Sequence, residues 1–130
     1  MPDALSAADA PASDRVRAEW RARIAAEYTS ATITQQLVLW LMQMGAPQDL
    51  LEAGIAIVGD ELVHARMSSE TYAAAGGTQA PAIDQDALVI APSADGLLHD
   101  VLRVAVQSFC LGETIAVPLF AHLRHGCTAG

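Results

Sequence analysis

Positive charge is scarce in this sequence of 130 residues. It contains 7 Lys and Arg residues against 15 Asp and Glu residues, which gives a formal net charge of −8 at pH 7. Proteins that bind nucleic acid neutralise phosphates with clustered basic side chains, and the sequence has no such cluster. We therefore expect no nucleic-acid partner and no binding to anionic membrane surfaces. The acidic balance is compatible with cation binding.

Cysteine, targeting signals and long uncharged runs are also scarce. The two cysteines, Cys110 and Cys127, lie far apart and form no Cys-x-x-Cys motif. They suggest a reducing cytoplasm, with Cys110 a small buried hydrophobic residue. The first residues are acidic and lack an apolar stretch, which excludes a secretory or mitochondrial signal. A membrane span needs about 20 nearly uncharged residues, and we find no such stretch, so we predict a cytoplasmic protein with no membrane partner.

What the sequence does contain is apolar surface arranged with helical spacing. Hydrophobic residues make up 52% of the chain, and a chain of this length forms one domain with a single core. Apolar residues recur at spacings of three and four in three segments, which predicts an all-α protein with three long helices. The predicted helices cover residues 14–44, 47–75 and about 94–123. The flanking residues 1–13 and 126–130 are predicted to be tails, with a disordered N-terminal one, around a helical domain at 14–125.

The predicted inward stripes follow directly from that spacing. They are Val16, Trp20, Ile24, Tyr28, Ala31 and Val38 in the first helix, Leu51, Ile55, Val58, Leu62, Ala65 and Tyr72 in the second, and Leu98, Leu102, Ala105, Phe109, Ala116, Phe120 and Leu123 in the third. Pro118 should kink the third helix.

Two different connections are predicted between the helices. Gly45 can end the first helix in the left-handed conformation and Pro47 can open the second, so the two helices should be antiparallel neighbours. Residues 76–94 form a long loop that contains an extended Leu88–Ile90 segment. A crossover that runs the length of a helical bundle requires such a loop.

Three acidic residues interrupt the predicted stripes. Glu27, Glu61 and Glu113 each lie near the middle of a different helix, and buried carboxylates are rare unless they are paired or bound to metal. Each one alone is more simply an exposed residue at the edge of its stripe, but together they favour a functional cluster. His64 follows Glu61 by three positions, so both side chains share one helical face and can bind one metal ion.

The stretch Asp60-Glu61-Leu62-Val63-His64-Ala65-Arg66 resembles the Asp-Glu-x-x-His-Ala-Arg motif of bacterial ferritin-like domain proteins. The surroundings of Glu27, the turn at residues 45–47 and the stretch 110–114 are similar to that group as well. The resemblance implies a ferritin-like helical bundle with a di-iron or di-manganese site. It also implies that Glu27 is a terminal ligand, Glu61 a bridging ligand, His64 a nitrogen ligand and Glu113 the ligand from the third helix, with an oxygen-dependent oxidoreductase or ferroxidase activity.

The sequence departs from the ferritin-like pattern at its end. The resemblance implies a fourth helix with a second Glu-x-x-His, which this chain does not contain. His122 and His125 lie about 180° and 120° from Glu113 around a straight helix, and His99 lies about 21 Å from it along the axis. We therefore expect these three histidines in solvent.

Three explanations of the missing helix remain open. The chain can be a gene fragment, a partner chain can supply the fourth helix, or two copies can form a homo-oligomer through the open apolar face. The alternative function is accordingly a non-catalytic helical interaction module, or a gene fragment, that retains the fold.

Overall fold

The computed structural model describes residues 12–126, apart from the side chains of Glu113 and Leu123. Helix α1 covers Asp14–Gln43 and helix α2 covers Gln48–Ala74. After a loop with one 3₁₀ turn, η2 at Asp86–Leu88, the chain is helical from Leu97 to Gly126. This last segment consists of α3 (Leu97–Val104), a π-helical stretch η3 (Ala105–Leu111) and α4 (Gly112–Gly126). The prediction of an all-α fold with three long helices is confirmed, whereas the predicted tails fall largely outside the described residues.

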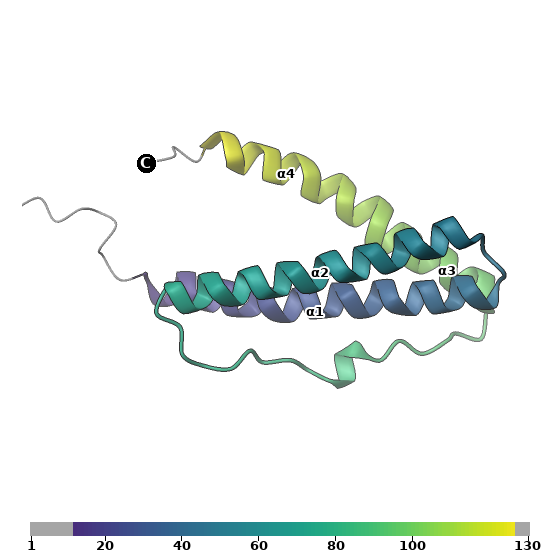
Figure 1. Cartoon of the computed structure of the whole chain (residues 1–130), viewed down its shortest axis with the longest axis horizontal. Helices are drawn as coiled ribbons and strands as arrows, with labels where there is room; N and C mark the ends of the chain where they lie inside the picture. Colours follow the sequence, from purple (N-terminus) through teal and green to yellow (C-terminus); the bar gives the residue numbers. More distant parts are fainter. Residues whose placement is uncertain (1–11, 127–130) are drawn as a thin grey trace, which may run out of the picture. The chain divides into compact units, whose positions relative to one another are not determined.

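Helices α1 and α2 form an antiparallel hairpin (Figure 1). The hydroxyl of Ser13 accepts a hydrogen bond from the backbone N–H of Val16 at 3.3 Å, which caps the start of α1. Gly45 has φ +73° and ends α1 in the left-handed region. A Cβ atom on Gly54 of α2 would lie 2.4 Å from Cγ2 of Val38 of α1, so a glycine is needed where the two helices approach.

The chain folds as two compact units, each built from parts of both hairpin helices. Among the described residues, the first unit contains residues 12–32 together with Ala56–Val89, and the second contains Ile33–Ile55 together with residues 90–126. In the first unit, Ile24 and Ala31 of α1 and Ala65 and Tyr72 of α2 are buried. In the second unit, the core is formed by Leu37, Trp40, Val101 and Val104, against which Ile33, Leu41, Ile90, Leu97 and Phe109 pack.

The third helix buries a different face from the predicted one. Leu98 and Leu102 are 57% and 55% exposed, whereas Val101 and Val104 are 7% and 5% exposed. The two faces lie about a third of a turn apart on a helix, and both carry apolar residues. Other residues predicted to point inward are also exposed, namely Val16, Tyr28, Ile55, Leu62 and Phe120.

A buried carboxylate fixes the start of this helix. Asp100 has no exposed surface, and its Oδ2 accepts a hydrogen bond of 2.8 Å from the backbone N–H of Ser93 in the preceding loop. Its Oδ1 lies 3.5 Å from Nη2 of Arg103. The hydrogen bond from the Ser93 backbone, with smaller contributions from the Ser93 hydroxyl and Arg103, lowers the pKa of Asp100 below its ordinary value. Asp100 therefore anchors the end of the long loop to α3.

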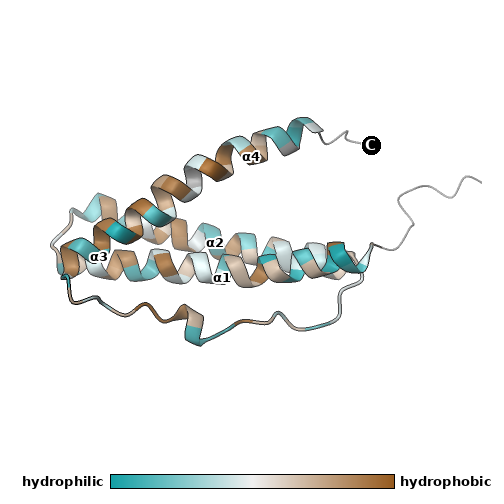
Figure 2. Ribbon diagram, turned by 180° about the vertical axis from the view of Figure 1, so that it is seen from behind, coloured by the Kyte–Doolittle hydropathy of each residue, from teal (hydrophilic) through white to brown (hydrophobic). Residues whose placement is uncertain are grey.

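The segment Leu97–Gly126 is rich in apolar residues, which colour much of its ribbon brown in Figure 2. Ile115 and Val117 of α4 are 68% and 63% exposed although they lie on different faces of the helix. By length and composition this helix could cross a membrane, so the prediction that no stretch reads as membrane-spanning was too strong. The prediction of a buried Cys110 is also wrong, because Cys110 is exposed on η3.

Candidate metal centre

Three predicted ligands meet in the first unit of the hairpin. Glu27 projects from the middle of α1, and Glu61 and His64 project from one face of α2, three residues apart. One carboxylate oxygen from each glutamate and one imidazole nitrogen from His64 lie within 4.8 Å of one another. The hairpin therefore brings together side chains that are 34 and 37 positions apart in the sequence (61 − 27 and 64 − 27).

The three side chains differ in exposure. The side chains of Glu27 and Glu61 are 11% and 17% exposed, whereas that of His64 is 54% exposed. Nδ1 of His64 lies 3.5 Å from Oε2 of Glu61 and 3.8 Å from Oε2 of Glu27. The two carboxylates thus lie on the buried side of the cluster, and the imidazole lies on its solvent-exposed side.

Burial raises the pKa of Glu27 above its ordinary value, and the hydrogen bond and negative charge of Glu61 raise it further. Arg23 and His64 oppose this rise. The negative charge of Glu27 is therefore disfavoured at this position. A divalent ion would therefore relieve the repulsion within the cluster.

The donor set suits particular metals. Mixed carboxylate and imidazole ligation is typical of iron and manganese, whereas structural zinc sites favour thiolate and imidazole ligands. The three residues supply fewer donor groups than the four to six that such ions usually bind, and the exposed side at His64 leaves room for further ligands.

Other predicted positions have separate outcomes. Glu113 lies in α4, in the other compact unit, and its side chain is outside the described part of the structure. His99 lies 3.7 Å from Asp95 through Nδ1 and Oδ2 and is half exposed. His122 and His125 are exposed. The expectation that these three histidines lie in solvent is confirmed.

Sequence reasoning missed the role of Arg23. Its Nε lies 3.2 Å from Oε1 of Glu27, one helical turn away. Arg23 contacts Oε1 of Glu27, so the other carboxylate oxygen, Oε2, is the one that lies near His64. The Arg23-x-x-x-Glu27 spacing, which places two opposite charges on one helical face, was the signal that could have shown it.

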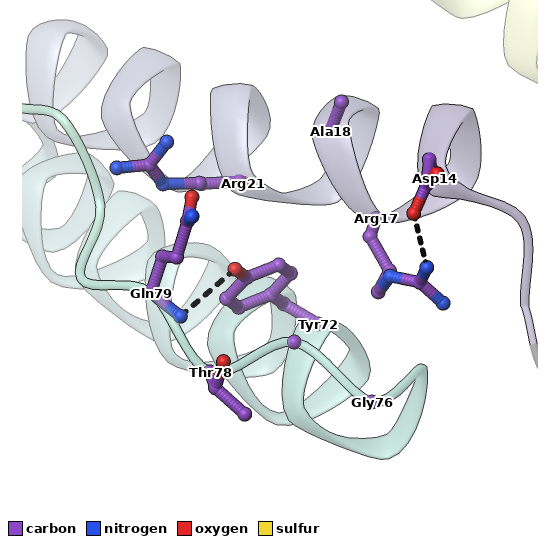
Figure 3. Close-up of a pocket in the computed structure, with 9 residues that line it drawn as sticks. Asp14, Arg17, Ala18, Arg21, Tyr72, Gly76, Thr78 and Gln79 are labelled. Carbon is purple, nitrogen blue, oxygen red and sulfur yellow. Dashed lines mark hydrogen bonds and ion pairs between the residues drawn. The ribbon is translucent and has the colours of Figure 1, made fainter.

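A second feature of this unit is a polar cavity of about 240 Å³ between the start of α1, the end of α2 and the loop that follows (Figure 3). Arg21 donates from Nε to the carbonyl of Ala80 at 2.8 Å, and Arg17 donates to the carbonyl of Ala75 at 3.4 Å. The backbone N–H of Gln79 donates to the hydroxyl of Tyr72 at 3.1 Å. The cavity residues hold the loop against the end of the hairpin, and none of the three cluster residues lines the cavity.

No protein-family model, curated protein or solved structure matches this chain.

Proposed function

We infer that this protein binds a redox-active divalent metal ion, iron or manganese, through Glu27, Glu61 and His64. The observation that supports the proposal is the convergence of two carboxylates and one imidazole from two helices within 4.8 Å. Exposed acidic groups often lie close together without binding a metal. Here, however, Glu27 is buried beside a second carboxylate, and its contact with Arg23 supplies one positive charge against two negative ones, so a bound cation would compensate the remaining charge.

Each residue has a distinct part in the proposed site. Glu27 and Glu61 supply hard oxygen donors, and His64 supplies a nitrogen donor from the exposed side. Arg23 orients Glu27 through its 3.2 Å contact and partly balances the charge of the carboxylates. A bound iron or manganese ion would supply one-electron redox chemistry, while these side chains hold and orient it.

The resemblance to ferritin-like proteins supports a narrower proposal, an oxygen-dependent oxidoreductase or ferroxidase in the cytoplasm. It rests on the Asp60–Arg66 motif and on the Glu27 position. The alternative is a non-catalytic helical interaction module that keeps these acids as part of its fold. Metal content separates the two, because only the first needs a stoichiometric ion.

The deciding experiment is metal analysis of the full chain purified from cells supplemented with iron and manganese. We expect a stoichiometric content of one of these metals in the wild type and its loss in Glu61→Ala and in His64→Ala. Glu70→Ala removes an exposed carboxylate from the same helix and should keep the metal. A wild-type chain that is helical by circular dichroism but contains no metal would contradict the proposal and favour the interaction module.

A further inference from the structure

The polar cavity at the end of the hairpin is bounded entirely by residues of the first unit. Its walls come from the start of α1, from Tyr72 of α2 and from residues 76–79 of the loop (Figure 3). Its volume of about 240 Å³ lies below the range of about 300–1,000 Å³ that is typical of sites for drug-sized ligands. The cavity therefore suits a small ligand, and its walls do not depend on the second unit.

Contacts between the loop and the two helices hold these walls in place. Nε of Arg21 donates to the carbonyl of Ala80 at 2.8 Å, and the backbone N–H of Gln79 donates to the hydroxyl of Tyr72 at 3.1 Å. Gly77 lies so close to the Tyr72 ring that a Cβ atom there would be 2.2 Å from Cε2 of the ring. A ligand that enters a site with walls already in place loses less binding free energy to ordering of the protein.

Arg21 gives the cavity a positive charge that no carboxylate balances. Arg17, which also lines the cavity, is paired with Asp14. Among the described residues, carboxylates pair with Arg17, Arg23 and Arg103, but none pairs with Arg21. Arg21 is nevertheless half-buried. The cavity therefore favours a ligand with a single negative charge, because one guanidinium charge remains to be balanced.

Two side chains of the cavity have hydrogen-bond donors without an acceptor in the described part of the chain. Tyr72 is 8% exposed, and its hydroxyl accepts the hydrogen bond from Gln79, so the hydroxyl proton remains to be donated. Arg21 uses Nε for the carbonyl of Ala80, which leaves its two terminal nitrogens. Donors of this kind beside an unbalanced positive charge fit an oxyanion, and a guanidinium matches the two oxygens of a carboxylate.

We propose that this cavity binds a small molecule with one carboxylate group, to which Arg21 and Tyr72 donate hydrogen bonds. Thr78 and Gln79 line the same cavity with further polar groups, so the rest of the ligand carries hydroxyl groups. Asp14 also lines the cavity and disfavours a second negative charge on the ligand. The site is separate from the metal cluster, because none of the three cluster residues lines the cavity.

The test is a nuclear magnetic resonance titration of the full, isotope-labelled chain. The probes are glycerate, propionate and inorganic phosphate, with sodium chloride at the same ionic strength as the blank. Propionate has the carbon skeleton of glycerate without its hydroxyl groups. We expect glycerate to give saturable shifts of the Gly77 and Gln79 backbone amides and of the Arg21 Nε–H. Propionate and phosphate should both need higher concentrations than glycerate for saturation.

Three substitutions separate the site from a general effect of charge. Arg21→Gln should weaken glycerate binding by about 10- to 100-fold, because hydrogen bonds from a charged donor are lost. Tyr72→Phe keeps the ring beside Gly77 and should weaken binding by about tenfold through loss of the hydroxyl donor. Arg15→Gln removes the same charge from an exposed position of α1 outside the cavity and should leave glycerate binding unchanged. Circular dichroism checks that each variant remains helical.

Several outcomes would overturn the proposed carboxylate site. One is a wild-type chain in which no probe gives saturable shifts, and another is wild-type affinity for glycerate in both Arg21→Gln and Tyr72→Phe. Equal weakening in Arg15→Gln and Arg21→Gln would assign the effect to overall charge rather than to the cavity. Tighter binding of phosphate than of glycerate would contradict the choice of a carboxylate. None of these outcomes bears on the metal-binding function, which has its own test.

Discussion

At the scale of single residues, two buried carboxylates show how local surroundings assign different roles to the same chemical group. Glu27 has its pKa raised because burial and a neighbouring carboxylate disfavour its charge. Asp100 has its pKa lowered because the Ser93 backbone N–H, the Ser93 hydroxyl and Arg103 favour its charge. Glu27 is therefore suited to accept a cation, whereas the charge of Asp100 is stabilised by the Ser93 backbone and by Arg103, and Asp100 serves as an anchor.

The lowered pKa of Asp100 predicts how stability depends on pH. The charged form favours the folded state, so its stabilising effect is present above the ordinary pKa of aspartate and is lost as pH falls through the folded-state value. We expect Asp100→Asn to lower the free energy of unfolding at neutral pH. The difference from wild type should shrink as the pH falls through that range.

Urea unfolding followed by circular dichroism at several pH values measures this difference. Asp95→Asn changes an exposed carboxylate near the same end of α3 and should show a smaller effect. A constant difference between wild type and Asp100→Asn at all pH values would contradict the role of the charge.

At the scale of elements, two glycines within α2 have opposite meanings. Gly54 approaches Val38 of α1, and a Cβ atom there would lie 2.4 Å from Cγ2 of Val38. Gly59 has no atom within 4 Å of the corresponding position. A glycine inside a helix normally lowers helix stability, so only Gly54 has a packing reason for its presence.

Substitution by alanine at these two positions should therefore change the stability of the fold in opposite directions. Gly54→Ala should destabilise the fold by about 1–3 kcal/mol, because the buried Val38 has to move. Gly59→Ala should stabilise it by about 0.5–1 kcal/mol through helix propensity alone. Thermal and urea unfolding of both variants provide the comparison, and a stabilised Gly54→Ala protein would show that the two helices do not approach closely at this point.

At the scale of the whole molecule, α1 and α2 run without interruption through both compact units. Ile24 is 2% exposed in the first unit and Trp40 is 4% exposed in the second. Because the same two helices belong to both cores, loss of packing in one core should weaken the other. We therefore expect the chain to unfold in a single cooperative transition.

Core substitutions in each unit test this cooperativity. Ile24→Ala should cost about 2–5 kcal/mol and Trp40→Ala about 3–5 kcal/mol. In each variant a single unfolding transition should move to lower denaturant concentration. Its midpoint should be the same whether unfolding is followed by far-ultraviolet circular dichroism or by molecular size. Leu39→Ala, at a residue that is 48% exposed, should change stability by only about 0.5 kcal/mol. Two separate transitions in either core variant would show that the units unfold independently.

Local patterns in the sequence determined the helices and much of the cluster. Apolar spacing, Ser13, Gly45 and Gly76 mark the helix ends, because capping and left-handed turns depend only on nearby residues. The Glu-x-x-His spacing places Glu61 and His64 together for the same local reason. That these two would meet Glu27 followed from the short turn, which requires an antiparallel hairpin.

Tertiary structure alone decided which apolar face the third helix buries and which carboxylates have a raised or a lowered pKa. Val101 rather than Leu98 faces the core, and the spacing of apolar residues in this segment permits either, so the choice depends on what α1 and the loop present to it. Asp100 became a buried anchor because Ser93 approaches it from the loop. Helix formation depends on neighbours along the chain, so the sequence by itself determined the helices. Burial and pKa depend on atoms that are distant in the sequence, so only the tertiary structure decided them.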